Sequence, residues 1–207
     1  MTIIATTDVI FMGSVVSRPD RKEGFQSGLF WGVVMDEMEK LDGLANQVAQ
    51  RFTEGSHRLV LAESCTCGLI ASVLGGVPGI SNVLCGSAVT YREATKMEWL
   101  NVSRKTLAEE TAVSDSVALQ MAEGALRHTP EANCAASITG HLGPNAPKEQ
   151  DGLVFVGISF RRNEKLVSSV RSVQLKTDGR ASRRREAVQN VLELLLAELR
   201  PCKEESP

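Results

Sequence analysis

The chain has 207 residues, 43% of them hydrophobic and 23% charged, and its formal net charge is −2. A chain of this length can bury one sizeable core, and the composition is ordinary for a soluble globular domain. So small a net charge provides no basic field, and nucleic acid is therefore not expected as a partner. The basic run at residues 180–185 is typical of a solvated helix face, on which one arginine can still bind an anion.

The cysteines and the apolar runs bear on metal binding and on the compartment. Five cysteines are an odd number, and a domain of this size does not need disulfides. The spacing of Cys65 and Cys67 is too tight for a zinc site, so we expect no metal. No apolar run approaches the ~20 residues that span a bilayer, and no basic signal-peptide start is present. We expect a cytoplasmic protein that does not bind membranes.

The two ends of the chain differ from its middle. Residues 1–34 mix apolar, charged and glycine-rich stretches at no clear period, which predicts a poorly ordered or appended N-terminal extension. Met35 or Met38 is an alternative start of translation. We expect one domain at 35–200 and a charged tail at 201–207.

Strand and helix patterns alternate through this domain. Helical periodicity appears at about 36–54, 69–74, 92–100, 104–110, 117–126 and 182–199. Strand patterns appear at about 59–62, 83–91, 134–138, 153–160 and 166–175. The last two strands surround a polar turn, which predicts a hairpin and hence a mixed sheet. The order predicts an α/β fold, a three-layer α/β/α sandwich with a mixed, mostly parallel sheet of about five strands.

Polar residues gather at the ends of three predicted strands. They are Glu63 to Thr66, Thr90 and Tyr91 with Lys96 nearby, and Thr139 with Gly140. Parallel strands would bring these clusters to one edge of the sheet, where open α/β sheets bind ligands. The turn after residue 62 is therefore the predicted active site.

Each candidate catalytic residue also has a structural interpretation. Ser64 is the candidate nucleophile, although a serine before a helix is commonly an N-cap. Cys65 is an alternative nucleophile, but no histidine nearby in sequence lowers its pKa, so a buried thiol explains it better. Tyr91 either packs at a strand end or handles protons, and Lys96 is either solvated or a base of lowered pKa. Backbone N–H groups after Ser64 suit a developing oxyanion.

At these clusters the chain resembles the CinA C-terminal domain family, whose stand-alone members are the PncC-type nicotinamide-nucleotide amidases. The matching segments are 62–69, 77–79, 89–91 with Lys96, 112–114, 121–124, 139–140 and 143–144. They keep the family's order, and the resemblance covers about residues 40–200. The family's N-terminal nucleotide domain has no counterpart here, so the chain is similar to the stand-alone form.

The resemblance implies hydrolysis of the carboxamide of nicotinamide mononucleotide to nicotinic acid mononucleotide and ammonia. It implies that Ser64 is the nucleophile, with Tyr91 and Lys96 as its proton-handling partners, and that no cofactor is needed. The substrate-binding residues that it implies are Glu63, Thr66, Cys67, Gly68, Thr139, Gly140, Arg180 and Arg184. It also implies a small-molecule nucleotide as the substrate and a homodimer.

Several positions depart from the family pattern. Cys67 replaces a glycine, where a thiol would crowd an approaching oxyanion. Glu93 falls near Lys96 and would favour its charged form. His141 with Leu142 replaces small apolar residues, and residues 145–151 replace a glycine-rich loop. One alternative is therefore a degenerate member that binds a nucleotide or a partner without turnover, and another is a cysteine- or metal-dependent enzyme.

Overall fold

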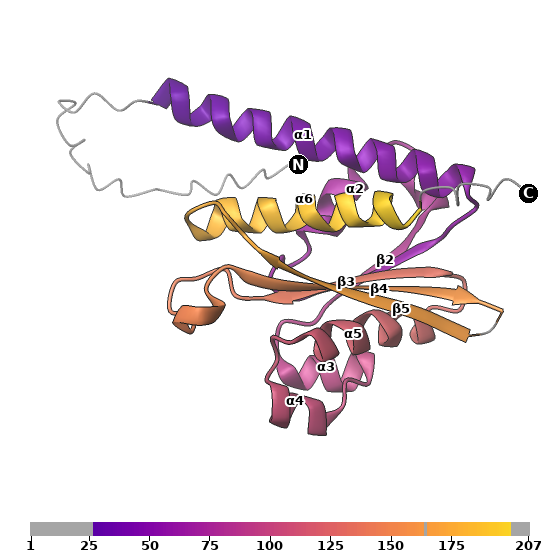
Figure 1. Ribbon diagram of the computed structural model, residues 1–207. Helices are drawn as coiled ribbons and strands as arrows, with labels where there is room; N and C mark the ends of the chain where they lie inside the picture. Colours follow the sequence, from indigo (N-terminus) through magenta and orange to yellow (C-terminus); the bar gives the residue numbers. More distant parts are fainter. Residues whose placement is uncertain (1–26, 164, 200–207) are drawn as a thin grey trace, which may run out of the picture.

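The computed structural model describes residues 27–163 and 165–199, and Figure 1 shows the path of the chain. Its helices are α1 (Ser27–Glu54), α2 (Leu69–Gly75), α3 (Glu93–Leu100), α4 (Arg104–Glu110), α5 (Asp115–His128) and α6 (Arg180–Glu198). Its strands are β1 (Leu59–Glu63), β2 (Leu84–Val89), β3 (Cys134–Gly140), β4 (Leu153–Arg162) and β5 (Lys165–Gln174). The expected tail at 201–207 lies outside the described residues, as do residues 1–26 of the expected extension.

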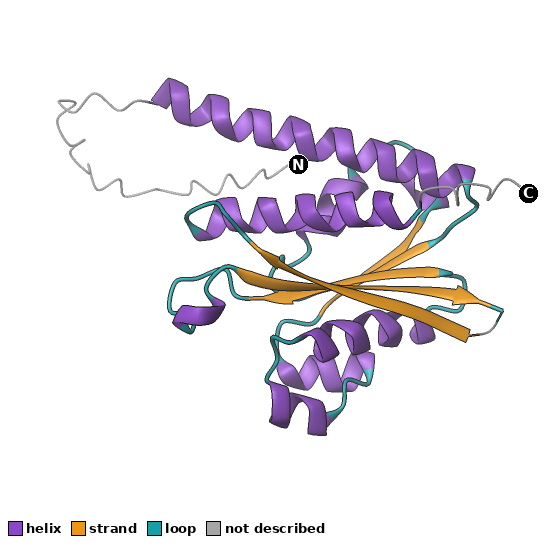
Figure 2. Ribbon diagram, in the orientation of Figure 1, coloured by secondary structure: helices purple, strands orange, loops and turns teal. Residues whose placement is uncertain are grey.

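One five-stranded sheet runs through the middle of the protein in the order β2-β1-β3-β4-β5. β1 pairs in parallel with β2 and β3, whereas β3–β4 and β4–β5 are antiparallel. Helices α1, α2 and α6 cover one face of the sheet, and α3, α4 and α5 cover the other (Figure 2). The predicted three-layer sandwich, the mixed sheet and the terminal hairpin are confirmed.

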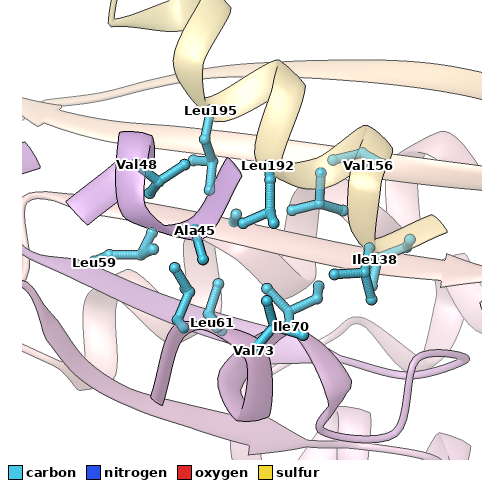
Figure 3. Packing of buried hydrophobic residues seen from close by; sticks show 14 of the residues in the cluster. Ala45, Val48, Leu59, Leu61, Ile70, Val73, Ile138, Val156, Leu192 and Leu195 are labelled. Atoms are coloured by element: carbon cyan, nitrogen blue, oxygen red, sulfur yellow. The ribbon is translucent and has the colours of Figure 1, made fainter. Parts of the chain in front are cut away.

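Strand β1 is apolar at consecutive positions because both of its faces are buried. Leu59 and Leu61 belong to the core under α1, α2 and α6, whereas Val60 and Ala62 belong to the core under α5. Figure 3 shows the first of these cores, where Ala45 of α1 and residues of α6 meet the sheet. Ala45 is fully buried, as the 3.6-residue period of this helix predicts.

Helix α1 begins at Ser27 and not at Asp36, so the predicted boundary between residues 34 and 35 falls inside a helix. In the sequence, Gly28 and Gly32 predict that this stretch is poorly ordered. Glycine, however, disfavours a helix by only about 1 kcal/mol, and it keeps the N–H group that proline lacks. The helix begins at Ser27, whereas the resemblance to the family begins at about residue 40.

Candidate functional site

The carboxyl ends of the three parallel strands meet at one edge of the sheet. In the register of the sheet, Glu63 at the end of β1 pairs with Val89 of β2 and with Ile138 of β3. The segments that follow these strands are therefore neighbours in space, although they are far apart in sequence. The predicted convergence of the polar clusters is observed.

Ser64 and Lys96 are in direct contact at this edge. The Lys96 ammonium donates to Ser64 Oγ at 2.8 Å and to the carbonyl oxygen of Thr90 at 2.6 Å. Ser64 is 8% exposed and Lys96 only 1% exposed. Lys96 is thus not a solvated helix residue, because α3 directs its side chain into the interior, where it meets the serine.

Burial changes the acid–base chemistry of this pair. Desolvation lowers the pKa of Lys96 to about 8, although negative charge on Cys65 or on Glu93 acts in the opposite direction. Burial also raises the pKa of the Cys65 thiol to about 12, so this thiol is uncharged at neutral pH and does not help to keep Lys96 protonated. Lys96 can therefore exist as a neutral amine near neutral pH, and Cys65 is poorly suited to act as a nucleophile.

Tyr91 and Arg180 form the opposite wall. Arg180 donates through Nη2 to the Tyr91 hydroxyl at 2.8 Å and through Nη1 to the carbonyl oxygen of Gly143 at 2.7 Å. Tyr91 is 51% exposed, and within the described part of the chain no hydrogen bond joins its hydroxyl to Ser64. The structure therefore brings Tyr91 to the site on the side of Arg180 and not on that of Lys96.

A cavity of about 200 Å³ lies between these groups. It is lined by the predicted residues Ser64, Tyr91, Lys96, Thr139, Gly140 and Arg180, together with Cys65, Ala112, Val113 and residues 141–146. Its floor requires glycine at position 140, where a Cβ atom would lie 2.8 Å from the Leu153 carbonyl oxygen. Thr139 donates through its hydroxyl to the carbonyl oxygen of Ala112 at 2.7 Å, which ties β3 to the neighbouring wall.

Glu63 and Thr66 lie outside this cavity. Glu63 is fully buried, and its carboxylate accepts hydrogen bonds from the Thr66 hydroxyl at 2.8 Å and from the Ser87 hydroxyl at 3.1 Å. The backbone N–H groups of Ile70 and Ala71 also donate to it, at 3.1 and 2.9 Å. This carboxylate therefore satisfies the first N–H groups of α2 and fixes the turn that carries Ser64.

Cys67 and Gly68 form the rest of this turn and do not line the cavity. Both adopt positive φ angles, 53° for Cys67 and 84° for Gly68. Glycine tolerates this backbone conformation best, and another residue loses roughly 1–2 kcal/mol there. The Cys67 side chain is exposed, so the expected crowding of an oxyanion by its thiol is not observed.

Of the predicted arginine pair, only Arg180 lines the Ser64 cavity. Arg184 is exposed and lines a second cavity on the far side of Arg180. The sequence alone did not predict the contact between α6 and the loop at 141–152. There, Arg183 forms an ion pair with Asp151 at 2.7 Å, and this hydrogen bond lowers the pKa of the carboxyl group. The only sequence signal for this contact was the basic run itself.

Across residues 27–163 and 165–199, no group of three or more His, Cys, Asp or Glu side chains is arranged to hold a metal ion. None of the helices that the structure describes is long and apolar enough to cross a membrane.

Comparison with known proteins assigns the chain to a family. The family model of the CinA C-terminal domain matches residues 41–199. The chain belongs to this family. A CinA-like protein of Syntrophotalea carbinolica is 39% identical over 125 residues, which are 59% of this chain and 30% of that protein. The chain spans about a third of the length of the curated relatives that it matches.

Solved structures of the CinA superfamily share this fold. The competence/damage-inducible protein CihA of Agrobacterium tumefaciens is 36% identical with a TM-score of 0.70, covering 76% of this chain and 94% of that one. A CinA superfamily protein of Klebsiella pneumoniae is 26% identical with a TM-score of 0.71, covering 77% of this chain and 97% of that one. The names of these proteins refer to competence and damage and specify no reaction.

Proposed function

We propose that this CinA-family chain is an amidohydrolase that converts nicotinamide mononucleotide, or a close relative, to the corresponding acid and ammonia. The observation that carries the proposal is the 2.8 Å contact between Lys96 Nζ and Ser64 Oγ, made by a lysine that is almost fully buried. A serine hydroxyl becomes a nucleophile when a neighbouring base accepts its proton. Burial, which lowers the pKa of Lys96 to about 8, makes this lysine such a base.

The proposed reaction proceeds through an acyl-serine. Neutral Lys96 takes the Ser64 proton as Oγ bonds to the carboxamide carbon and the carbonyl electrons move to oxygen. The lysine ammonium then gives that proton to the amide nitrogen, the C–N bond breaks, and ammonia leaves. A water molecule that loses its proton to Lys96 attacks the ester, and return of the proton to Ser64 Oγ releases the carboxylic acid.

Other groups of the site support these steps. The Thr90 carbonyl oxygen holds Lys96 Nζ from a second direction, which keeps it at Ser64. The backbone N–H groups that follow Ser64 in the turn are the proposed donors to the tetrahedral oxyanion. Tyr91 and Arg180 face the cavity together and are proposed to contact the substrate. In this arrangement the Tyr91 hydroxyl hydrogen-bonds to the departing nitrogen, while Lys96 delivers the proton.

The remaining assignments are also part of the proposal. A nucleotide substrate, the absence of a cofactor and a homodimer rest on the family resemblance, whereas a cytoplasmic location rests on the cysteine content and on the apolar runs of the sequence. Light scattering of the purified protein tests the homodimer directly.

The deciding experiment is ammonia release from nicotinamide mononucleotide by the wild-type protein and by Ser64→Ala. Ser72→Ala is a matched control, because Ser72 is an exposed serine on α2 outside the cavity. We expect activity in the wild type and in Ser72→Ala and its loss in Ser64→Ala. Equal ammonia release by all three proteins would refute the proposal. Binding of the nucleotide without ammonia release would favour the non-catalytic alternative.

A further inference from the structure

One wall of the Ser64 cavity belongs to the loop between β3 and β4. This wall consists of residues 141–146, and Leu142 is its only member whose side chain lies in a hydrophobic core. The base of the loop continues the β3–β4 ladder, because the His141 N–H donates to the Leu153 carbonyl oxygen and the Gly152 N–H to that of His141, both at 3.0 Å. Beyond this base, the position of the wall depends on contacts with other elements.

An ion pair with α6 holds the far end of this loop. Arg183 donates through Nη1 to Asp151 Oδ1 at 2.7 Å and through Nε to the carbonyl oxygen of Thr177 at 3.0 Å. The Arg183 side chain is only 15% exposed, whereas that of Asp151 is 43% exposed. A single guanidinium group of α6 therefore joins the loop to the segment that connects β5 with α6.

Gly143, in the middle of the wall, packs directly against this ion pair. A Cβ atom at position 143 would lie 2.9 Å from Asp151 Oδ1 and 3.0 Å from Arg183 Nη1, and the φ angle of 67° also favours glycine. The carbonyl oxygen of Gly143 accepts a hydrogen bond from Arg180 Nη1 at 2.7 Å. Two arginines three residues apart on α6 thus hold the same residue of the wall, one by its carbonyl group and the other by close packing.

The reacting groups are held by other contacts. Lys96 Nζ donates to Ser64 Oγ and to the Thr90 carbonyl oxygen, and the Ser64 N–H donates to the carbonyl oxygen of Ile138 at 3.0 Å. Among the described residues, no hydrogen bond joins Ser64 or Lys96 to residues 141–152. The wall and the reacting pair are therefore positioned independently, so a change in one need not disturb the other.

We propose that the Arg183–Asp151 ion pair is a positioning pair for substrate recognition, which fixes the 141–146 wall through Gly143. Neither residue lines the cavity, so the pair acts through the wall and not by contact with the substrate. A partly exposed ion pair contributes little to global stability, but it can decide how often a loop opens locally. Asp151 belongs to the segment 145–151, which differs from the glycine-rich loop that the family resemblance implies. The inference rests on the amidohydrolase function proposed above.

The test measures KM and kcat for ammonia release from nicotinamide mononucleotide. Arg183→Met and Asp151→Ala should each raise KM roughly threefold to tenfold, with kcat and its pH dependence retained because the Ser64–Lys96 contact is unchanged. The double variant should be no worse than the weaker-binding single variant, since both substitutions remove the same contact. Arg58→Met is the matched control, because it breaks an exposed ion pair with Glu131 before β1, at the opposite end of that strand from Ser64.

Hydrogen exchange measured by mass spectrometry tests the same role without turnover. Peptides from 141–152 should exchange faster in Arg183→Met than in the wild type and in Arg58→Met, whereas peptides from 64–71 should not change. If the wild type releases no ammonia, the amidohydrolase proposal fails, and the calorimetric dissociation constant for the mononucleotide takes the place of KM with the same expected increase.

Several results would overturn the role of the ion pair. They are an unchanged KM or dissociation constant in both single variants, a fall in kcat alone, increases in KM that multiply in the double variant, and unchanged exchange of the loop. A Ser64→Ala protein that releases no ammonia but still binds the mononucleotide distinguishes these results from failure of the amidohydrolase proposal, because binding then reports on the wall alone.

Discussion

Lys96 Nζ lies 2.8 Å from Ser64 Oγ although the two residues are 32 positions apart in the chain. The contact joins the turn after β1 to helix α3, which follows β2. It exists because β1 and β2 are parallel neighbours whose carboxyl ends lie together. The chemistry proposed for this protein depends on this contact more than on any other.

The first prediction concerns the base. Replacing Lys96 by methionine should reduce kcat for ammonia release by roughly 10²–10⁴-fold, because the serine then has no proton acceptor. In the wild type, kcat/KM should rise with pH and level off above about 8, as Lys96 loses its proton. Lys105→Met, a substitution of an exposed lysine on α4, should leave both the rate and the pH profile unchanged. A profile that is flat across pH 8 would contradict the assignment of Lys96 as the base.

The same lysine should make stability depend on pH. Burial lowers its pKa from 10.5 to about 8, so between these values the unfolded chain holds a proton that the folded chain lacks. The Lys96 contribution to the free energy of unfolding therefore rises with pH across this window, by roughly 3 kcal/mol in total. Urea unfolding should be measured near pH 8 and near pH 10.5. Between these two pH values, the free energy of unfolding of the wild type should rise by this amount relative to that of Lys96→Met. A pH-independent difference between the two would mean that Lys96 keeps its ordinary pKa.

A third prediction separates positioning from substrate contact at Glu63. In Glu63→Gln an amide group faces backbone N–H donors, so at least one buried donor loses its acceptor. We expect a loss of about 1–3 kcal/mol in the free energy of unfolding. We also expect a lower kcat with little change in KM, because the Ser64 turn shifts while the rest of the cavity lining stays. Glu131→Gln is the control, since Glu131 forms an exposed ion pair with Arg58 and should change stability by less than about 1 kcal/mol. A raised KM with full stability would instead indicate that Glu63 contacts the substrate.

The fourth prediction uses the thiols. A thiol-alkylating reagent at neutral pH should label Cys67, which is exposed, and should spare Cys65 and Cys134, which are buried and whose pKa values burial raises. Peptide mapping by mass spectrometry identifies the labelled positions. Ammonia release should persist after Cys67 is labelled, because this residue does not line the Ser64 cavity. Loss of activity in step with labelling at Cys67 would favour the cysteine-dependent alternative.

The amino-acid sequence by itself determined the layers of this protein and the edge of the sheet at which its polar clusters meet. Periodicity and local signals suffice for this, as the continuous apolar run of β1 and the Ser114 hydroxyl that caps α5 illustrate. The start of α1 was misplaced because glycines weaken a helix without ending it.

Only the tertiary structure decided which of the predicted residues meet. It placed Lys96 in the interior beside Ser64, turned Glu63 toward the N–H groups of α2, and separated Arg184 from the Ser64 cavity. The local sequence does not determine these side-chain positions. They depend on burial and on which strands are neighbours in the sheet, and burial in turn sets whether the lysine can lose its proton.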